Sequence, residues 1–443
     1  MNKLLLWWHF HQPLYKDNGS GKYQLPWVFL HLIKDYHYFL ELALEFPGVK
    51  QNFNYSPVLL EQIADYTENP EQVDDPWIHA FLSDPASIDD ETLEFILKHF
   101  FSVNFERAIM DSHRYYSLYK KRDSKEEYSP DDIMALQTLF FYYWLSPIAK
   151  EKNEELRNIR SREAITSSDK ELVWSTAKSI AGEFFGLLSK AQAADHLEIT
   201  ASPFYHPILP LLMDTNCVKD MNIPMPSLRF SYPDDAKFQI TSALEYMDKL
   251  DLNVNGMWPS EGSIDSASVS LMGQCGVKYA GSDERVLFKS LNGSKRDFTL
   301  YKYDGVKLFF RDRRISDDIA FKYSAMDKSD SISHFHNHLS HSPIPLIVIM
   351  DGENAWEYFP ENGLPFLRNL FTSLTDKQVE TYTLEHAAEE FDCGELDKVA
   401  PGSWIDVGFP LWIGSEGKNL SWDSLTLIRS TIAPEDLSPP GRN

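Results

Sequence analysis

The chain has 443 residues, which is enough for a large α/β domain with additional elements and too many for one small domain. Its formal net charge of −24 opposes binding to nucleic-acid phosphates or anionic lipid, so we expect neither nucleic acid nor a membrane surface as a partner. An uncharged polysaccharide is compatible with this charge. The sequence gives no signal for an oligomeric state.

Three cysteines, Cys217, Cys275 and Cys393, lie far apart and form no CxxC pair. Their odd number and wide spacing favour buried free thiols in a reducing compartment. The apolar run Leu4–Trp8 ends at His9, so it is shorter than the roughly 7–15 residues of a signal-peptide core. No apolar run approaches the ~18 residues of a membrane helix. These features predict a cytoplasmic protein.

Short apolar runs that end in polar or aromatic residues recur along the chain. They cover residues 4–8, 52–55, 197–200, 254–258, 277–280, 308–310 and 344–350. Segments with helical periodicity lie between them, for example 234–250 and 266–275. Alternating strands and helices predict a parallel sheet with right-handed crossovers. Polar residues directly after such strands are where a parallel barrel builds its active site.

Residues from about 58 to 190 interrupt this alternation with mostly helical, aromatic-rich sequence. We predict a helical insertion that packs on the barrel, because so many aromatic side chains would not remain in solvent. Within it, the charged stretch Lys120–Asp132 is typical of an exposed loop. We therefore expect a catalytic barrel over residues 1–365 and a short helical or irregular region over 366–443 that completes the cleft and ends in a frayed Pro-rich tail.

Glu261 follows the predicted strand that ends at Trp258 and Pro259. Pro259 ends the strand because it lacks an amide donor, and this leaves Glu261 at the barrel mouth beside an indole ring. A carboxylate fixed there can attack an anomeric carbon or accept a proton. The alternative is an acid that favours the start of the next helix.

Asp351 follows the apolar run Ile347–Met350, with Gly352 next to it and Trp356 nearby. A carboxyl at the end of a buried strand is a good place for the raised pKa of a general acid, and Glu353 competes for this role. Two strand-end carboxylates are the minimal equipment for glycoside cleavage. A separation of about 5–5.5 Å gives retention of configuration, and a wider one gives inversion.

Histidines form further candidate sites. His11 ends the first predicted strand, where it either donates a hydrogen bond to a substrate hydroxyl or caps the strand. Glu198 and His206 could both face the cleft, or His206 could order its Pro-flanked loop. The run His334, His336, His338 and His341 has a spacing that matches no standard structural zinc site, so we predict no metal.

Together these segments resemble glycoside hydrolase family 57. The resemblance rests on these motifs: His11-Gln12-Pro13; Phe204-Tyr205-His206-Pro207 with Glu198; Trp258-Pro259-Ser260-Glu261; Asp351-Gly352-Glu353-Asn354; and Gly402-Ser403-Trp404 with Trp412 and Trp422. The segments Ser282–Glu284 and Phe310–Arg313 also look like family features. The match covers about residues 3 to 425 and is closest to amylopullulanase-like members.

The resemblance implies an incomplete seven-stranded parallel (β/α) barrel and a retaining mechanism on α-glucans, without a cofactor or an obligatory metal. It implies that Glu261 is the nucleophile and that Asp351, the acid before the glycine, is the proton donor rather than Glu353. It further implies a longer helical C-terminal bundle than the residues after Trp422 provide. The implied substrate-binding residues are His11, Glu198, His206, Trp258, Asp283, Arg311, Asp312, Trp356 and Trp404.

Several reaction outcomes remain open at this level. Water as acceptor gives amylase or pullulanase activity, and a sugar acceptor gives glucanotransferase or branching activity. A metal-dependent polysaccharide deacetylase would need one Asp and two His ligands, whereas the strand ends supply only His11 and His206 without an obvious partner. A non-catalytic glucan-binding protein is the third alternative, and the presence of both acids argues against it.

Overall fold

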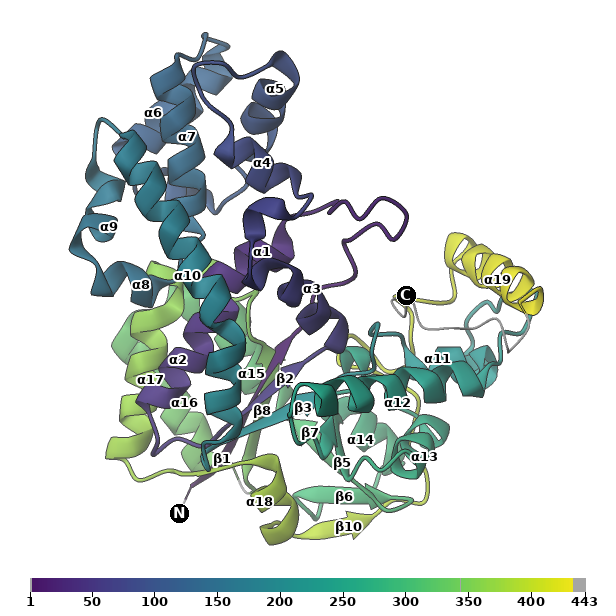
Figure 1. The fold of residues 1–443 in the computed structure, drawn as a ribbon. Helices are drawn as coiled ribbons and strands as arrows, with labels where there is room; N and C mark the ends of the chain where they lie inside the picture. Colours follow the sequence, from purple (N-terminus) through teal and green to yellow (C-terminus); the bar gives the residue numbers. More distant parts are fainter. Residues whose placement is uncertain (1, 343, 433–443) are drawn as a thin grey trace. The chain divides into compact units, whose positions relative to one another are not determined.

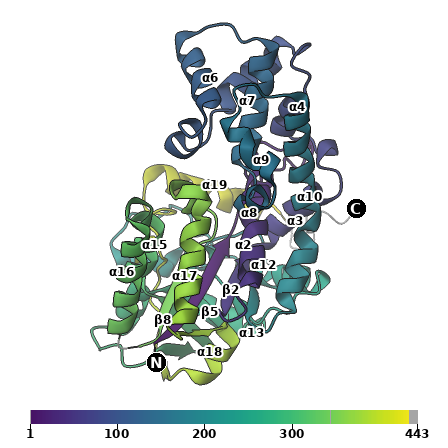
Figure 2. The ribbon, with the colours of Figure 1, turned by 90° about the vertical axis from the view of Figure 1, so that its left-hand side faces the viewer.

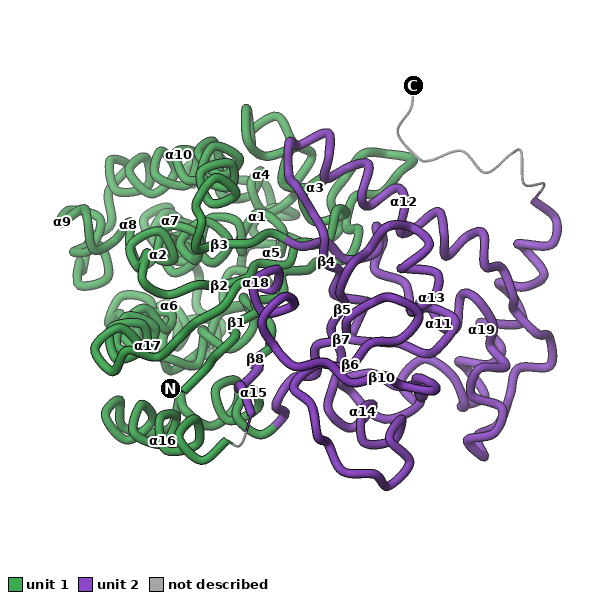
Figure 3. Tube along the Cα trace, turned by 90° about the horizontal axis from the view of Figure 1, so that it is seen from below, with its two compact units in different colours: residues 1–199, 314–342, 349–383 green, residues 200–313, 343–348, 384–443 purple. Residues whose placement is uncertain are grey.

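The computed structural model describes residues 2–342 and 344–432. It contains two compact units, which are coloured separately in Figure 3. Unit 1 comprises residues 1–199, 314–342 and 349–383, and unit 2 comprises residues 200–313, 343–348 and 384–443. The chain passes from one unit to the other within strands β3 (Leu197–Ala201) and β8 (Leu346–Asp351).

The strands of unit 1 centre on β1 (Lys3–Phe10). It pairs in parallel with β2 (Gln51–Tyr55) and with β9 (Glu380–Tyr382), and β8 is its other neighbour. Nearly every side chain of β1 and β2 is buried, as in parallel strands that are covered on both faces. The buried Asn52 amide has two partners, because it donates to the carbonyls of Leu6 and Tyr382 at 2.9 and 3.1 Å.

Helices fill the region between β2 and β3. They are α3 (Pro57–Thr67), α4 (Pro76–Leu82), α5 (Asp90–His99), α6 (His113–Ser124), α7 (Pro130–Tyr143), α8 (Pro147–Lys152), α9 (Glu154–Asn158) and α10 (Ser167–Gln192). Figure 1 shows α4 to α7 grouped around one end of the long helix α10. The other part of α10 reaches the sheet, where the Phe184 ring lies 6.1 Å from that of Tyr55 on β2. The predicted helical character of this region is confirmed.

The prediction of an exposed loop over Lys120–Asp132 is wrong at both ends. Helix α6 continues to Ser124, and α7 begins at Pro130. Asp132 is buried in the first turn of α7, where it accepts from Ser129 in a capping box and pairs with Lys121 at 2.7 Å. Lys125, Glu126 and Glu127 do lie in the exposed connection between the two helices, whereas the other charges of this stretch lie on α6 and α7.

Other helices complete unit 1. They are α1 (Trp27–His31), a π-helical turn (Leu32–Tyr36), α2 (His37–Glu45), α15 (Arg313–Phe321), α16 (Lys328–His341) and α17 (Leu364–Asp376). Figure 2 shows α16 and α17 next to each other. In α16, His336 is buried against the Ser373 hydroxyl of α17 at 2.8 Å, and His334 contacts the Tyr323 hydroxyl at 2.9 Å. Among the residues that the structure describes, no three His, Cys, Asp or Glu side chains gather as a metal site would require.

Unit 2 contains the strand order β3-β4-β5-β7-β6-β10. Its strands are β4 (Gly256–Met257), β5 (Tyr279–Asp283), β6 (Leu300–Tyr303), β7 (Val306–Arg311) and β10 (Cys393–Glu395). All neighbours in this series pair in parallel except β6 and β7, which form an antiparallel hairpin. Asp304 and Gly305 make its two-residue turn with φ of 46° and 86°, which fits the Asp-Gly preference of such turns.

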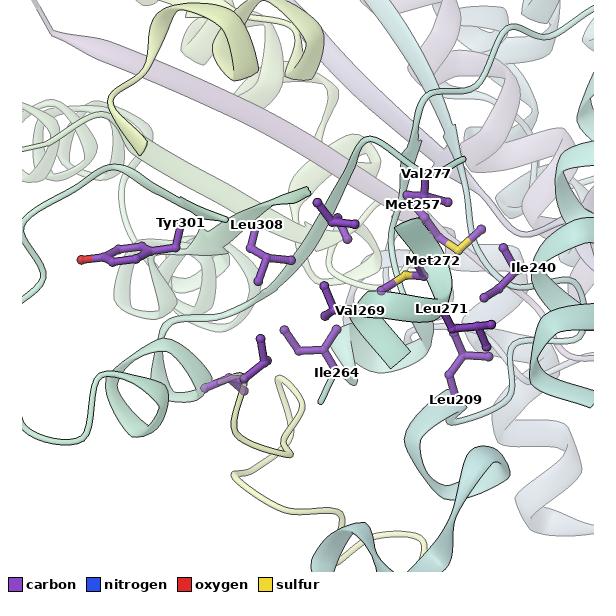
Figure 4. Packing of buried hydrophobic residues seen from close by; sticks show 14 of the residues in the cluster. Leu209, Ile240, Met257, Ile264, Val269, Leu271, Met272, Val277, Tyr301 and Leu308 are labelled. Carbon is purple, nitrogen blue, oxygen red and sulfur yellow. The ribbon is translucent and has the colours of Figure 1, made fainter. Parts of the chain in front are cut away.

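Apolar side chains from strands and helices form the core of unit 2. Met257 of β4, Leu308 of β7, and Val269 and Met272 of α13 are all buried in it (Figure 4). The helices of this unit are α11 (Leu209–Met213), α12 (Pro233–Lys249), α13 (Ser266–Gln274), α14 (Glu284–Ser290), α18 (Leu384–Glu390) and α19 (Glu416–Ser430).

All seven predicted strands are present, as β1, β2, β3, β4, β5, β7 and β8, and the parallel α/β fold class is confirmed. The region after residue 365 is not only helical or irregular, since it contributes β9 and β10. The predicted domain boundary at 365 stays a prediction, and the Pro-rich tail lies outside the described residues. The three cysteines are half-buried and unpaired. No described helix is long and apolar enough to cross a membrane.

Candidate active site

Unit 1 brings together two histidines and two carboxylates at the ends of β1 and β8. The loop after β8 is fixed to β1 by backbone contacts, since the Gly352 N–H donates to the carbonyl of His9 at 2.7 Å. The Glu353 carboxylate in turn accepts from the His11 N–H at 3.1 Å. This arrangement anchors the two residues that directly follow Asp351, which is the last residue of its strand.

The histidines of this cluster are held by short polar side chains of the neighbouring strand end. His9 Nδ1 lies 2.6 Å from Asn54 Oδ1, and His11 Nδ1 lies 2.8 Å from Ser56 Oγ. Burial lowers the pKa of His9, and burial together with the nearby His9 lowers the pKa of His11 to about 3. Both rings are therefore neutral near pH 7, and each offers one donor and one acceptor to its surroundings.

Asp351 and Glu353 have different environments although only one residue separates them. Asp351 is half-buried and accepts from the Asn354 amide at 2.9 Å. Glu353 is 2% exposed, and its Oε2 has no hydrogen-bond partner among the described residues. Burial, with the charge of Asp351 adding to it, raises the pKa of Glu353 well above its ordinary value. Asp351 is thus the more exposed of the two carboxyl groups, and burial favours the neutral form of Glu353.

Trp356 supports this loop from the core. It is fully buried against Trp8 and Phe39, and its indole N–H donates to the Gly352 carbonyl at 2.8 Å. The expectation that Trp356 contacts substrate is therefore corrected, because no part of its ring reaches the surface. It fixes the loop instead.

Unit 2 forms a second cluster around Glu261. Glu261 lies in a short turn after Pro259 and adopts the left-handed backbone conformation, with φ 57° and ψ 23°. Trp404 holds it twice: the Trp404 backbone N–H donates to the Glu261 carbonyl at 3.0 Å, and the indole N–H donates to Oε2 at 2.9 Å. The imidazole Nε2 of His206 lies 4.0 Å from Oε1. The side chain remains partly exposed between these neighbours.

A pair of backbone hydrogen bonds joins the segment that carries Trp404 to the segment that follows Glu261. Ile264 and Gly402 exchange backbone hydrogen bonds of 3.0 and 3.1 Å. Trp258 is fully buried, with its ring 5.1 Å from that of Trp404. Direct contact of Trp258 with a substrate is therefore not supported. Trp404 is the indole of this pair that contacts the carboxylate.

Asp283 is the fully buried centre of an ion-pair network next to Trp404. It accepts from Arg311 Nε at 2.9 Å and from Arg285 Nε at 2.8 Å. The Arg311 guanidinium lies 5.4 Å from the Trp404 ring centroid, and Arg285 also donates to the Trp404 carbonyl. Asp283 thus positions two arginines and does not itself reach a ligand, contrary to the expected substrate contact.

The other expected site residues are half-buried. Glu198 lies on β3, and Asp312 directly follows β7 with its backbone N–H bound to the Ile347 carbonyl at 2.7 Å. Sequence reasoning missed Arg285, which comes two residues after Asp283, and Asn54 and Ser56, which bind the histidines. The polar pair that flanks Tyr55 at the end of β2 was a usable signal for the latter two.

Comparisons with known proteins identify the chain's relatives. The model of glycosyl hydrolase family 57 matches residues 5–400. A GH57 branching enzyme from the archaeon Thermococcus kodakaraensis, solved with glucose, has a TM-score of 0.58 at 16% identity over 96% of this chain and 78% of that one. The GH57-type branching enzyme of Pyrococcus horikoshii gives 0.59 at 14% identity, over 95% and 76%.

A third solved structure has the same fold. The α-amylase AmyC of Thermotoga maritima matches with a TM-score of 0.53 at 13% identity, over 91% of this chain and 77% of that chain. No curated protein matches the sequence. These structural likenesses show a shared fold, and the family match covers most of the chain, from the first strand to the segment just before Trp404. The chain therefore belongs to glycosyl hydrolase family 57.

Proposed function

We propose that the chain is a retaining glycoside hydrolase or transglycosidase that acts on α-glucans such as starch, glycogen or maltooligosaccharides. Glu261 is the nucleophile and Asp351 the general acid/base. The observation that carries the proposal is how Glu261 is held in a family 57 chain: Trp404 binds Oε2 with a neutral indole N–H, and the side chain stays partly exposed. Trp404 thereby fixes one oxygen of a carboxylate that a ligand can still reach.

In the first step Oε1 of Glu261 attacks the anomeric carbon, and the bond from that carbon to the glycosidic oxygen breaks. The proton of Asp351 passes to the departing oxygen. In the second step Asp351 removes a proton from water or from a sugar hydroxyl, whose oxygen attacks the same carbon and releases Glu261. A separation of about 5–5.5 Å between the two carboxyl groups is the geometry of this mechanism, and it stays a prediction.

The environment of Asp351 supports its role. Burial raises the pKa of the neighbouring Glu353, which favours its neutral form beside Asp351. The Asn354 amide donates to Oδ2, which orients the carboxyl group and leaves Oδ1 for the glycosidic oxygen.

Free, half-buried cysteines further support a reducing, cytoplasmic location for the enzyme.

Two matched substitutions test the roles. Glu261→Gln removes the nucleophile at nearly constant volume and is expected to abolish turnover of every substrate. Asp351→Asn is expected to form the glycosyl enzyme from an activated aryl α-glycoside, whose departing group needs no protonation, but not from maltooligosaccharides. Release of the glycosyl group is then slow in water, because the general base is lost too. Azide added to the Asp351 variant should give a glycosyl azide with retained configuration. An inverted azide product, or azide rescue of the Glu261 variant alone, would show that the roles are reversed.

Maltooligosaccharides distinguish the reaction outcomes. Shorter products alone indicate hydrolysis, and longer products as well indicate transfer. The proposed steps require no metal, so EDTA should leave both hydrolysis and transfer unchanged. Activity that is lost in EDTA and restored by zinc would favour a metal-dependent polysaccharide deacetylase.

A further inference from the structure

Trp404, which holds the Glu261 carboxylate, lies in a tight turn rather than in a helix or strand. The Ser403 N–H donates to the Asp406 carbonyl across this turn at 3.0 Å, and the residue after Trp404, Ile405, is 45% exposed. A turn of four residues does not by itself fix the direction of a large side chain. Contacts from other segments of unit 2 therefore decide where the indole N–H points.

Arg285 joins this turn to the rest of unit 2. Its guanidinium donates through Nε to Asp283 at 2.8 Å and through a terminal nitrogen to the Trp404 carbonyl. The other terminal nitrogen lies 3.8 Å from the Asp406 carboxylate of the same turn. One rigid, planar group thus contacts the turn at two residues and is itself bound to a fully buried carboxylate.

Asp283 is a fixed anchor for this arginine. It is the last residue of β5 and the N-cap of α14, where its Oδ1 accepts from the Arg285 N–H at 3.0 Å. Its Oδ2 accepts from Arg311, whose guanidinium lies 5.4 Å from the Trp404 ring centroid. A substitution of the Arg285 side chain leaves both of these contacts, because one uses the backbone and the other a different arginine. The role of Arg285 can therefore be separated from that of the buried ion pair behind it.

The peptide groups on both sides of Trp404 are bound. Its N–H donates to the Glu261 carbonyl at 3.0 Å, and its carbonyl accepts from Arg285. These two bonds restrain the backbone dihedrals of Trp404, and with them the direction of its side chain. The indole N–H is thereby held 2.9 Å from Glu261 Oε2. A rotation within the turn would misalign this hydrogen bond, and hydrogen bonds weaken steeply when they are misaligned.

We propose that Arg285 is a positioning residue for the nucleophile: it fixes the turn that carries Trp404, and through the indole it holds the Glu261 carboxylate in the orientation for attack. The inference rests on the proposed function, in which Glu261 is the nucleophile. Arg285 acts through Trp404 and does not need to touch the substrate. A displacement of about 1 Å in a catalytic group costs on the order of 100-fold in rate, so even a partial release of Trp404 should be measurable.

Substitution of Arg285 tests this role in the kinetics. Arg285→Met removes the guanidinium and is expected to lower kcat on maltooligosaccharides about 5- to 10-fold, as for one lost hydrogen bond, while KM stays within about twofold. Arg285→Lys should recover part of the loss, because an ammonium can bind Asp283 or the Trp404 carbonyl but lacks the planar fork that binds both. Arg229→Met is the matched control in the same unit. Arg229 donates through Nε to Asp214 at 2.9 Å, and its substitution should change neither constant.

A double-mutant cycle separates positioning through Trp404 from any other effect of Arg285. If Arg285 acts through the indole N–H, Arg285→Met should lower kcat by less than about twofold in a protein that already carries Trp404→Phe. Losses that multiply in the double variant would overturn the inference, and so would wild-type kcat in Arg285→Met. If Arg285→Met does not fold, Arg285→Lys takes its place in the cycle with a smaller expected loss.

Fluorine NMR tests the same contact without relying on activity. In protein labelled with 5-fluorotryptophan, the resonance that disappears in Trp404→Phe belongs to Trp404. Glu261→Gln changes the acceptor of the indole N–H and should shift this resonance, and it should shift it less than half as far in the Arg285→Met background. Equal shifts in the two backgrounds, or none in either, would overturn the inference. A protein that shows the reduced shift but does not act on α-glucans would contradict the proposed function and leave the positioning of Glu261 by Arg285 in place.

Discussion

A single methyl group added at Gly352 is expected to distort the candidate active site. An ideal Cβ there would lie 2.2 Å from Cε1 and Cζ of Phe10, well below van der Waals contact. Phe10 cannot move aside easily, because it is fully buried between aromatic rings that include Tyr36 and Tyr55 at 5.6 and 5.1 Å. The loop must yield instead, and with it Asp351.

The size of the effect follows from this clash. Ordinary contact begins near 3.4 Å, so Cβ and the Phe10 ring must separate by about 1.2 Å. Overpacking of this kind costs about 1–3 kcal/mol of unfolding free energy. A displacement of about 1 Å in a catalytic group costs on the order of 100-fold in rate. Gly352→Ala should therefore lower kcat/KM on maltooligosaccharides about 100-fold and lower the free energy of unfolding in urea by about 1–3 kcal/mol.

A matched glycine controls for the substitution itself. Gly186 lies on the exposed side of α10, with nothing within 4 Å of its ideal Cβ. Gly186→Ala should leave activity unchanged and stabilise the protein by about 0.5–1 kcal/mol. Phe10→Leu combined with Gly352→Ala should recover part of the activity, because leucine lacks the clashing ring atoms. Wild-type stability and activity in Gly352→Ala alone would refute the reasoning.

Two further predictions concern the carboxylates. Trp404→Phe removes the indole N–H that holds Glu261 Oε2 and should lower kcat/KM about 10-fold or more, as expected for the loss of a hydrogen bond to a charged group. The control Trp422→Phe loses a hydrogen bond of the same 2.9 Å length, to the Trp412 carbonyl, and should leave kcat/KM unchanged. Equal kcat/KM in the two variants would contradict the role of Trp404. For Glu353 the sign follows from its raised pKa: the folded state retains a proton that the unfolded state loses above about pH 4.5, so this residue makes stability fall as pH rises from there. Glu353→Gln should remove that fall. Relative to the wild type, the variant's free energy of unfolding in urea should therefore be higher at pH 8 than at pH 5. The same difference between variant and wild type at both pH values would be inconsistent with a buried neutral acid.

The strands were predictable because buried parallel strands need continuous apolar runs, and each run ended in a polar segment. The short strands β9 and β10 were not, since three residues carry no periodicity and form only by pairing with β1 and β6. The β6–β7 hairpin did carry a signal in Asp304-Gly305 between two apolar runs, and it was not used.

For the site, position after a strand pointed to Glu261 and left Asp351 and Glu353 as competing acids. Only the family resemblance favoured Asp351, and the roles of both acids stay predictions. Contacts between distant segments were not available from spacing: Trp404 lies 143 residues after Glu261, and only the family resemblance pointed to it. Nor could a motif tell which side chains of a strand end face inward. Trp258 and Trp356 were therefore expected at the surface, although both are buried.

The left-handed backbone at Glu261 has a consequence for how this enzyme tolerates change. A residue with a side chain costs about 1–2 kcal/mol in that conformation, and His206, which faces Glu261, adopts it too with φ 58°. Glycine or asparagine would relieve this cost at position 261. Glu261→Gly should thus give a protein that is inactive yet melts at a higher temperature than the wild type. A selection for thermal stability alone would therefore favour replacement of the proposed nucleophile, and only a selection coupled to turnover would keep it.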